Sequence, residues 1–319
     1  MKILANDGID AGGKAALEAQ GHVVETTFVP QDELVHYMTT NNVEGLLVRS
    51  ATKVRKDIID GCPQLKFVGR GGVGIDNIDA AYAKEKGLTV FNTPASSSQS
   101  VAELAMSMMF AAARFTYASG QSMPTVGATQ FGDLKKQYSK GIELSGKTLV
   151  IVGFGRIGRS LAQYALGCGM KVIAVDRSDK TSSTVTCSLG GLSIDVPVAH
   201  ATLEEALTQA DFISLHVPKQ PNGAAVIGME EMKKMKNSAV IVNTSRGGVV
   251  NEDDLLVALN DNIIKAACLD VFENEPTPRE DLLKHSRVIA TPHIGASTGE
   301  AQERIGLEIA SIVAGLVGA

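Results

Sequence analysis

The sequence of 319 residues contains no tryptophan, and only 4% of its residues are aromatic. No segment approaches the ~20 consecutive apolar residues that a membrane span needs. The start, MKILANDGID, carries one lysine and a short apolar run, which is too little for a secretory signal peptide. We therefore expect a cytoplasmic protein with no membrane partner.

Cysteine and positive charge are also scarce. The four cysteines, Cys62, Cys168, Cys187 and Cys268, are scattered and lack CxxC spacing, so we expect reduced thiols and neither a disulfide nor a metal site. The 30 Lys and Arg residues are outnumbered by 35 Asp and Glu residues, which gives a formal charge of -5. This balance offers no attraction for a polyanion and excludes nucleic acid as the main partner.

Glycine, in contrast, is abundant. The chain has 32 glycines, about a tenth of its residues against a usual ~7%. The hydrophobic share of 44% and the charged share of 20% are those of a folded globular protein. Because a single core seldom grows past roughly 250 to 300 residues, the length predicts two domains.

Short apolar runs alternate with helical patterns in two series, as βα units do in parallel sheets. We therefore predict two doubly wound α/β domains, a Rossmann NAD-binding domain and a smaller flavodoxin-like substrate domain. The predicted strands of the first series are 3–5, 23–26, 45–48, 65–68 and 88–91, with helices such as 11–20 and 31–39, and the six strands of the second lie in TLVIVGFG, KVIAVD, DFISLHV, AVIVNTS, KAACLD and RVIATP.

Three further segments set the domain boundaries. A helix rich in Ala and Met is predicted over 98–114, a polar arm over 119–141, and a tail helix over 298–319 that returns to the first domain. The predicted domains are thus 1–97 together with 293–319, and 98–292, with a ligand cleft between them. A Ser/Thr-rich loop is expected over 178–188.

The loop Gly153-Phe154-Gly155-Arg156-Ile157-Gly158 follows a predicted strand and opens a helix. Glycines at this spacing allow a tight turn, close approach of the backbone to a pyrophosphate, and close packing of helix on strand. Asp176, at the end of the next strand, would bind the adenosine ribose hydroxyls and repel a 2′-phosphate. The loop and the acid predict NAD as the cofactor, although the neighbouring Arg177 could accommodate the phosphate of NADP.

Three polar side chains follow later strands of the same domain. Arg246 lies in NTSRGG, Glu275 in LDVFENEP and His293 in TPHIGA. Exchange of a hydride between NAD and a hydroxy acid needs a general acid/base, a group that orients it and a cation for the carboxylate. Each residue alone is ordinary, but together, on strand ends of one Rossmann domain, they predict such a site.

These segments resemble the signatures of the D-isomer-specific 2-hydroxyacid dehydrogenases. GFGRIG, NTSRGGVVNEDDL, LDVFENEP and PHIGAST occur in the family's order, and the resemblance covers essentially the whole chain. VRSATKV and LKFVGRGGVGIDNID are most similar to members that oxidise D-3-phosphoglycerate to 3-phosphohydroxypyruvate in serine biosynthesis. The resemblance implies that this chain has the same activity and forms a homodimer. It also implies a short form of the enzyme without a C-terminal regulatory domain.

The resemblance also implies a role for each site residue. Arg246 would clamp the substrate carboxylate, His293 would take the proton of the C2 hydroxyl, and Glu275 would stabilise the protonated His293. Arg49 and Ser50 offer a bidentate cation and a hydroxyl, which suit a phosphate. The other expected contacts are the backbone at Val73 and Gly74 for the substrate carboxylate and, for NAD, Gly153, Gly155, Arg156, Ile157, Gly158, Asp176, Val217, Pro218, Thr244, Ser245, Asp270, His293, Gly295 and Ala296.

Two departures from the family pattern bear on these roles. The segment 92–98 reads NTPASSS where relatives usually carry Asn after the turn, and the arm lacks the usual tryptophan. Two other functions stay open. One is reduction of hydroxypyruvate or glyoxylate, in which Arg49 would meet no phosphate. The other is an NAD-sensing binding protein like the family's corepressor relatives.

Overall fold

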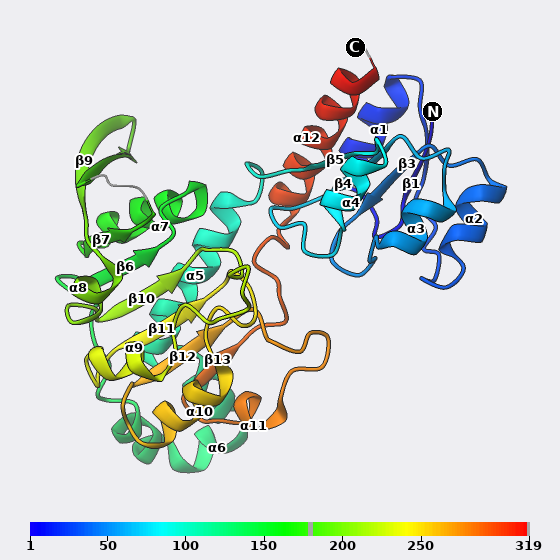
Figure 1. Ribbon diagram of the computed structural model, residues 1–319. Helices are drawn as coiled ribbons and strands as arrows, with labels where there is room; N and C mark the ends of the chain where they lie inside the picture. The colour runs from blue at the N-terminus through cyan, green and yellow to red at the C-terminus, as the bar shows by residue number, and fades with distance from the viewer. Residues whose placement is uncertain (178–180, 318–319) are drawn as a thin grey trace. The chain divides into compact units, whose positions relative to one another are not determined.

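The computed structural model describes residues 1–177 and 181–317. Parts of the expected Ser/Thr-rich loop, at 178–180, and of the tail helix, at 318–319, lie outside these residues. The chain divides into two compact units, and each is an α/β structure (Figure 1). Unit 1 comprises Met1–Ser100 and Ala296–Ala319, and unit 2 comprises Val101–Gly295.

Unit 1 contains a five-stranded parallel sheet with the order β2-β1-β3-β4-β5. This is the flavodoxin-like order, which confirms the predicted fold class of this part of the chain. The strands are β1 (Lys2–Ala5), β2 (Val23–Glu25), β3 (Gly45–Val48), β4 (Phe67–Arg70) and β5 (Thr89–Asn92), and the helices are α1 (Ala11–Ala19), α2 (Leu34–Thr40), α3 (Lys56–Gly61), α4 (Ala80–Glu85) and α12 (Gly299–Val317).

Successive residues of β1 point to opposite faces of this sheet, so each face has its own core. Leu4 packs in the core formed with α2, α3 and α4, whereas Ile3 and Ala5 pack in the core formed with α1 and α12. The helices α1 and α12 approach closely where Gly13 meets Gly306, because a Cβ on Gly13 would overlap the backbone of Gly306. Glycine at both positions therefore permits the tail helix to complete unit 1.

Unit 2 contains an eight-stranded sheet with the order β13-β12-β11-β10-β6-β7-β9-β8, parallel except for the β8–β9 pair. It has the Rossmann arrangement that the sequence predicts. The strands are β6 (Thr148–Val152), β7 (Lys171–Val175), β8 (Ser182–Leu189), β9 (Leu192–His200), β10 (Phe212–Leu215), β11 (Val240–Asn243), β12 (Ala266–Leu269) and β13 (Val288–Ala290), and the helices after the arm are α7 (Arg156–Gly167), α8 (Leu203–Leu207), α9 (Met229–Lys234), α10 (Glu252–Asn260) and α11 (Glu280–Leu283).

The hairpin of β8 and β9 corrects the expectation of a loop over 178–188. Its turn is Gly190-Gly191 with positive φ angles of 56° and 89°, the conformation that suits a tight hairpin turn. Val185 and Cys187 are buried in the core beside α7. A smaller correction concerns β4, expected at 65–68, because Leu65 is held in a turn by a bond from its N–H to the carbonyl of Cys62.

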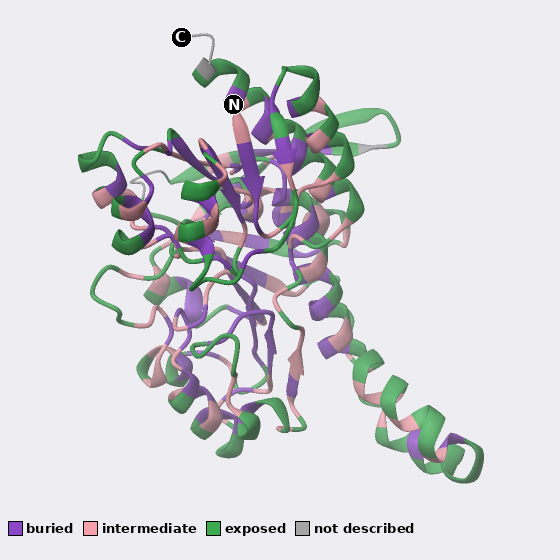
Figure 2. Cartoon of the chain, turned by 90° about the vertical axis from the view of Figure 1, so that its right-hand side faces the viewer, coloured by how far each residue is buried: buried purple, intermediate pink, exposed green. Residues whose placement is uncertain are grey.

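The segment between the two units is helical. The helix predicted over 98–114 is α5 (Ser98–Arg114), within which the chain passes from unit 1 to unit 2, and the arm is a second helix, α6 (Thr116–Gln137). Only Gly127 and Leu134 of α6 are buried, so it has almost no core of its own. Figure 2 shows this exposure, together with the buried strands of the sheets. Within the described residues, no helix is both long and apolar enough to cross a membrane.

Candidate active site

The predicted site residues of unit 2 lie at one edge of its sheet. The carboxyl ends of parallel strands meet at the same edge, which is where open α/β sheets bind ligands. The glycine loop follows β6, Asp176 follows β7, Val217 and Pro218 follow β10, Thr244, Ser245 and Arg246 follow β11, Asp270 and Glu275 follow β12, and His293 and Gly295 follow β13. Ala296, the next residue, is the first residue of the second segment of unit 1.

The glycine loop places backbone where side chains would not fit. Gly153 has a positive φ of 93°, and a Cβ on it would overlap the carbonyl oxygen of His216. A Cβ on Gly158 would overlap the carbonyl oxygen of Gly153, so α7 begins directly against the end of β6. Gly155 differs, because a Cβ there would meet no atom within 4 Å. The N-terminus of α7, with Arg156 and Ile157 in its first turn, thus adjoins open space suited to a pyrophosphate.

Other polar groups at this edge also fit a dinucleotide. The carboxylate of Asp176 is exposed at the end of β7 and accepts the backbone N–H of Arg177 at 2.7 Å. The hydroxyl of Thr244 is buried and has no hydrogen-bond partner within the described chain, and neither does Nδ1 of His216. His216 directly follows Leu215 of β10, and Thr244 directly follows Asn243 of β11. Leu215 and Asn243 pair between the two strands. Buried polar atoms are rarely left unpaired, so a polar ligand is the expected partner.

His293 and Glu275 form the central pair of the site. Nδ1 of His293 lies 2.8 Å from Oε2 of Glu275, and about a third of each side chain is exposed, at 34% and 36%. His293 has a left-handed backbone with φ 55°. Since an ionised carboxylate only accepts hydrogen bonds, Nδ1 of a neutral His293 carries the proton and Nε2 keeps a lone pair. The imidazole therefore presents a base at Nε2.

Glu275 is held in its ionised form. Burial acts to raise the pKa of Glu275, but the hydrogen bond with His293 and the backbone N–H of Phe272, at 3.0 Å from Oε1, outweigh it. The charges of His293 and Arg246 act in the same direction, and the pKa lies below its usual range. Glu275 is thus an anion that can stabilise a protonated His293.

Arg246 lies in a loop whose shape depends on glycine. A Cβ on Gly247 would overlap the backbone of Phe272, so this loop packs directly on the one that carries Glu275. The side chain of Asn243 fixes the loop by donating to the carbonyl of Arg246 at 2.9 Å and accepting from Ser245. Nη1 of Arg246 donates to the carbonyl of Ser245 at 2.6 Å.

Asp270 holds the His293 loop in place, a role that the sequence analysis did not identify. The side chain is 1% exposed. Its Oδ1 accepts the Thr291 hydroxyl at 2.6 Å and the N–H of Ile294 at 2.8 Å, and its Oδ2 accepts the N–H of Gly295 at 2.8 Å. These bonds hold residues on both sides of His293, with Thr291 before it and Ile294 and Gly295 after it. No local pattern in LDVFENEP reveals them, because they form only when β12 and β13 pair.

The expected substrate residues of unit 1 lie at the carboxyl ends of β3 and β4. Arg49 is half-buried and Ser50 is exposed, while Val73 is 37% exposed and Gly74 half-buried. Arg70, which the sequence analysis did not single out, lies next to Arg49, since β4 pairs Arg70 with Val48 and Nε of Arg70 donates to the Arg49 carbonyl at 3.3 Å. The register of β3 and β4 places the two arginines at neighbouring strand ends, where the side chain of Arg70 contacts the backbone of Arg49.

The turn at 92–98, where the sequence departs from its relatives, is tied to other parts of unit 1. The Thr93 hydroxyl accepts the N–H of Gly72 at 2.7 Å. The Ser96 hydroxyl donates to Glu308 of α12, and its carbonyl accepts Nε of Arg304 at 3.0 Å. The serine at 96 thus anchors the tail helix.

Comparison with known proteins adds to this geometry. Residues 106–295 match the family model described as "D-isomer specific 2-hydroxyacid dehydrogenase, NAD binding domain". The match agrees with the cofactor predicted from the glycine loop and Asp176, and NAD is the cofactor of this domain.

Relatives match across almost the whole chain. Hydroxypyruvate reductase of Thermotoga maritima is 42% identical over 312 residues, which cover 97% of this chain and 95% of that protein. D-3-Phosphoglycerate dehydrogenase of Methanocaldococcus jannaschii is 42% identical over 311 residues, 97% of this chain, and the chain spans 56% of its length. The crystal structure of D-lactate dehydrogenase from Aquifex aeolicus, complexed with NAD and lactic acid, is 27% identical with a TM-score of 0.77, covering 100% of this chain and 96% of that one.

Proposed function

The chain belongs to the D-isomer-specific 2-hydroxyacid dehydrogenases, and we propose that it oxidises D-3-phosphoglycerate to 3-phosphohydroxypyruvate. The observation that carries the choice of substrate is Arg49, a half-buried cation at the carboxyl end of β3, whose backbone is bonded to Arg70 of the neighbouring strand β4. Planar guanidinium groups bind phosphate oxygens in bidentate fashion. Arg49, followed in the chain by the exposed Ser50 with its hydroxyl, suits a phosphate dianion.

The residues of unit 2 supply the proton chemistry in this proposal. The glycine loop and Asp176 would hold NAD, which would supply the acceptor for the hydride on C2 of the substrate. Nε2 of His293 takes the proton of the C2 hydroxyl, and Glu275 stabilises the resulting imidazolium through the 2.8 Å bond to Nδ1. Arg246 binds the substrate carboxylate. Asp270 acts as a positioning residue, because its bonds to Ile294 and Gly295 fix the loop that carries His293.

We propose the remaining contacts from the family resemblance. The backbone at Val73 and Gly74 binds the substrate carboxylate. Asp176 binds the adenosine ribose, and Thr244 donates its hydroxyl to the cofactor. The other proposed cofactor contacts are Gly153, Gly155, Arg156, Ile157, Gly158, Val217, Pro218, Ser245, Gly295 and Ala296.

Steady-state kinetics with two substrates test the phosphate assignment. We expect the Arg49→Gln variant to lose at least about tenfold in kcat/KM for D-3-phosphoglycerate and much less for D-glycerate, since a charge-assisted bond is lost only with the phosphate. Lys53→Gln, which removes an exposed charge from the same loop, is the matched control. An equal loss on both substrates would show that Arg49 does not bind the phosphate.

A second candidate function is reduction of hydroxypyruvate. It is favoured by the relative from Thermotoga maritima, which is 42% identical and bears that name. A wild-type kcat/KM for hydroxypyruvate well above that for 3-phosphohydroxypyruvate would replace the first proposal with this one. If NAD binds but no hydroxy acid or keto acid is turned over, the NAD-sensing binding protein becomes the better description.

The setting of the enzyme is proposed from the family resemblance alone. We propose a cytoplasmic homodimer that acts in serine biosynthesis. Sedimentation equilibrium tests the oligomeric state, and a purely monomeric protein at working concentrations would contradict the proposal.

A further inference from the structure

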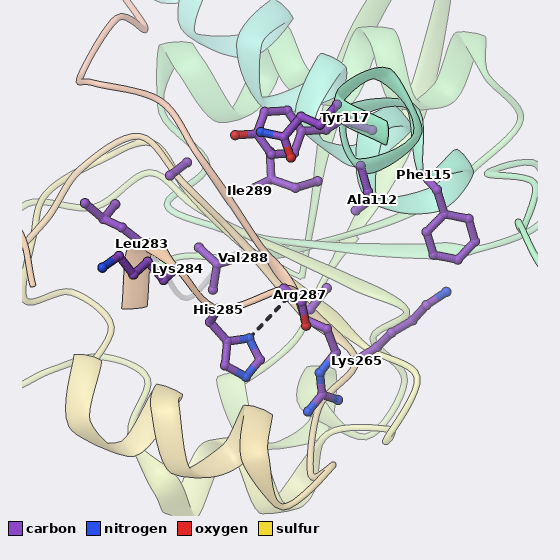
Figure 3. A pocket seen from close by; sticks show the side chains of 16 residues that line it. Ala112, Phe115, Tyr117, Lys265, Leu283, Lys284, His285, Arg287, Val288 and Ile289 are labelled. Carbon is purple, nitrogen blue, oxygen red and sulfur yellow. Dashed lines mark hydrogen bonds between the residues drawn. The ribbon is translucent and has the colours of Figure 1, made fainter. Parts of the chain in front are cut away.

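Unit 2 has a pocket at the edge of its sheet opposite to the candidate active site. The pocket has a volume of about 250 Å³ and is lined by the end of α5, the start of α6, and the residues that lead into β12 and β13 (Figure 3). Lys265 directly precedes β12, and Arg287 directly precedes β13. His293 and Glu275 follow the opposite ends of the same two strands, so the pocket is separate from the candidate active site.

Three side chains of the pocket, Lys265, Arg287 and His285, offer hydrogen-bond donors. Nζ of Lys265 lies 5.7 Å from the centre of the Phe115 ring. Nη1 of Arg287 donates to Oδ1 of Asn262 at 3.0 Å, which leaves other donors of the guanidinium. Nδ1 of His285 accepts the N–H of Arg287 at 3.2 Å, so Nε2 of a neutral His285 carries the proton. In Figure 3, these three side chains gather on one side of the pocket.

The charge of these groups is not balanced within the pocket. None of its sixteen lining residues, all within the described chain, is acidic. Burial lowers the pKa of Lys265, and the nearby charge of Lys147 lowers it further. Burial and then Arg287 lower the pKa of His285, which favours its neutral, donating form. An anion would thus find a partly desolvated cation and two further donors here.

Gln121, Lys284 and Ser286 are the other polar side chains of the lining, and the remaining wall is mostly apolar. The helices contribute Ala111, Ala112 and Ala118 and the rings of Phe115 and Tyr117, and β13 contributes Ile289. The volume lies below the ~300–1,000 Å³ of pockets for drug-sized ligands, which limits the ligand to about one ring system. We propose that this pocket binds a small aromatic carboxylate, with its ring against the α5–α6 wall and its carboxylate between Lys265 and Arg287.

Fluorescence anisotropy of indole-3-acetate tests the proposal. Because the chain has no tryptophan, indole emission comes from the probe alone when tyrosine is not excited. We expect saturable binding to the protein saturated with NAD, because the pocket is separate from the candidate cofactor site. Lys265→Met and Arg287→Gln should each weaken it at least about tenfold through loss of a charge-assisted bond. The neutral amide of the probe should also bind at least about tenfold more weakly than the carboxylate, for the same reason.

The controls separate the proposal from its rivals. Lys171→Met removes an exposed cation at the start of β7, on the same edge of the sheet, and should leave binding unchanged. Cooperative thermal unfolding of each variant shows that it is folded. Displacement of the probe by NAD, equal binding to wild type and Lys265→Met, or no saturable binding would each overturn the proposal. No probe binding, together with an oligomeric state that changes in Arg287→Gln, would instead make the pocket an interface between two copies.

Discussion

The two edges of the unit 2 sheet differ in the charged groups that they carry. The carboxyl edge holds the carboxylates of Asp176, Asp270 and Glu275, together with His293 and Arg246. The amino edge is mainly cationic, with Asp211 as its acidic residue and Lys147, Lys171, Lys236, Lys265 and Arg287 as its cations next to the strands. One sheet thus presents a mixed site suited to acid–base chemistry at one edge and a cationic surface at the other.

Helix dipoles explain part of this difference. In a βαβ unit, the helix begins at the carboxyl edge and ends at the amino edge, so its negative end lies near the amino edge. Cations are favoured there by typically 0.3–1 kcal/mol each. The dipoles do not explain why Lys265, His285 and Arg287 surround one pocket, whereas Lys236 is paired with Asp211 at 2.9 Å.

If the comparison of the two edges is right, the largest loss of activity is expected from a substitution of His293. If the chemistry belongs to the carboxyl edge, His293→Asn removes the base, and kcat should fall by about 10²–10⁴-fold. The rate of NADH formation measures this, while calorimetry should show NAD binding within about twofold of wild type. His36→Asn, at an exposed position of α2, is the control and should keep wild-type kcat. Turnover near wild type in His293→Asn would remove this residue from the mechanism.

A smaller effect is expected at Asp270, which positions the His293 loop. Asp270→Asn replaces one acceptor oxygen by an amide that cannot accept from Ile294 or Gly295, so a buried donor loses its partner. We expect the free energy of unfolding to fall by about 1–3 kcal/mol and kcat to fall more than the affinity for NAD. Urea unfolding and steady-state kinetics measure the two quantities.

The matched variant at this position is Thr291→Val. It removes only the hydroxyl that donates to Oδ1 of Asp270 at 2.6 Å and should cost less stability and less activity than Asp270→Asn. Equal stability of Asp270→Asn and wild type would show that the loop is fixed by other contacts.

The carboxyl edge was largely predictable from the sequence, and the amino edge was not. The glycine loop comes directly after an apolar run, and Arg246, Glu275 and His293 come within about six residues of one, so locating a strand also locates these residues near its end. The pocket at Lys265 depends on α5, α6, β12 and β13 meeting in space, and no local pattern encodes that meeting. Arg70 and the bonds of Asp270 are of the same kind, because strand register creates them.

The hairpin of β8 and β9 was missed for a different reason. The strand β8, SSTVTCSL, is short of apolar residues, and its Ser and Thr residues suggested a loop. The Gly190-Gly191 turn was nevertheless visible between Leu189 and Leu192. The outer strand buries only alternate residues such as Val185 and Cys187, so strong hydrophobic runs are not required there.

The smallest effect is expected for two glutamates of the carboxyl edge, Glu252 and Glu275, because their pKa values shift in opposite directions. Burial raises the pKa of Glu252, and the bond from the N–H of Glu273 opposes this without reversing it. Glu275 is also subject to burial, but its bonds with His293 and Phe272 lower its pKa. Glu275 therefore stabilises the fold above a pH of about 4.3, and this contribution disappears as the pH falls through its folded-state pKa. For Glu252 the sign is opposite, because its ionised form is disfavoured in the folded protein. The free energy of unfolding therefore falls as the pH rises from about 4.3 through the raised pKa of Glu252.

Urea unfolding of Glu275→Gln and Glu252→Gln between acid and neutral pH measures both signs. At neutral pH, Glu275→Gln should be less stable than wild type and Glu252→Gln more stable, each by about 1 kcal/mol or less, since Glu275 is about a third exposed and screened by solvent. Both differences should shrink as the pH falls to the acid range. The Gln at 252 can still accept the N–H of Glu273, so this variant isolates the charge. Differences of the same sign would mean that the bonds of Glu275 do not outweigh its burial, and Glu275 would then be unfit to stabilise a protonated His293.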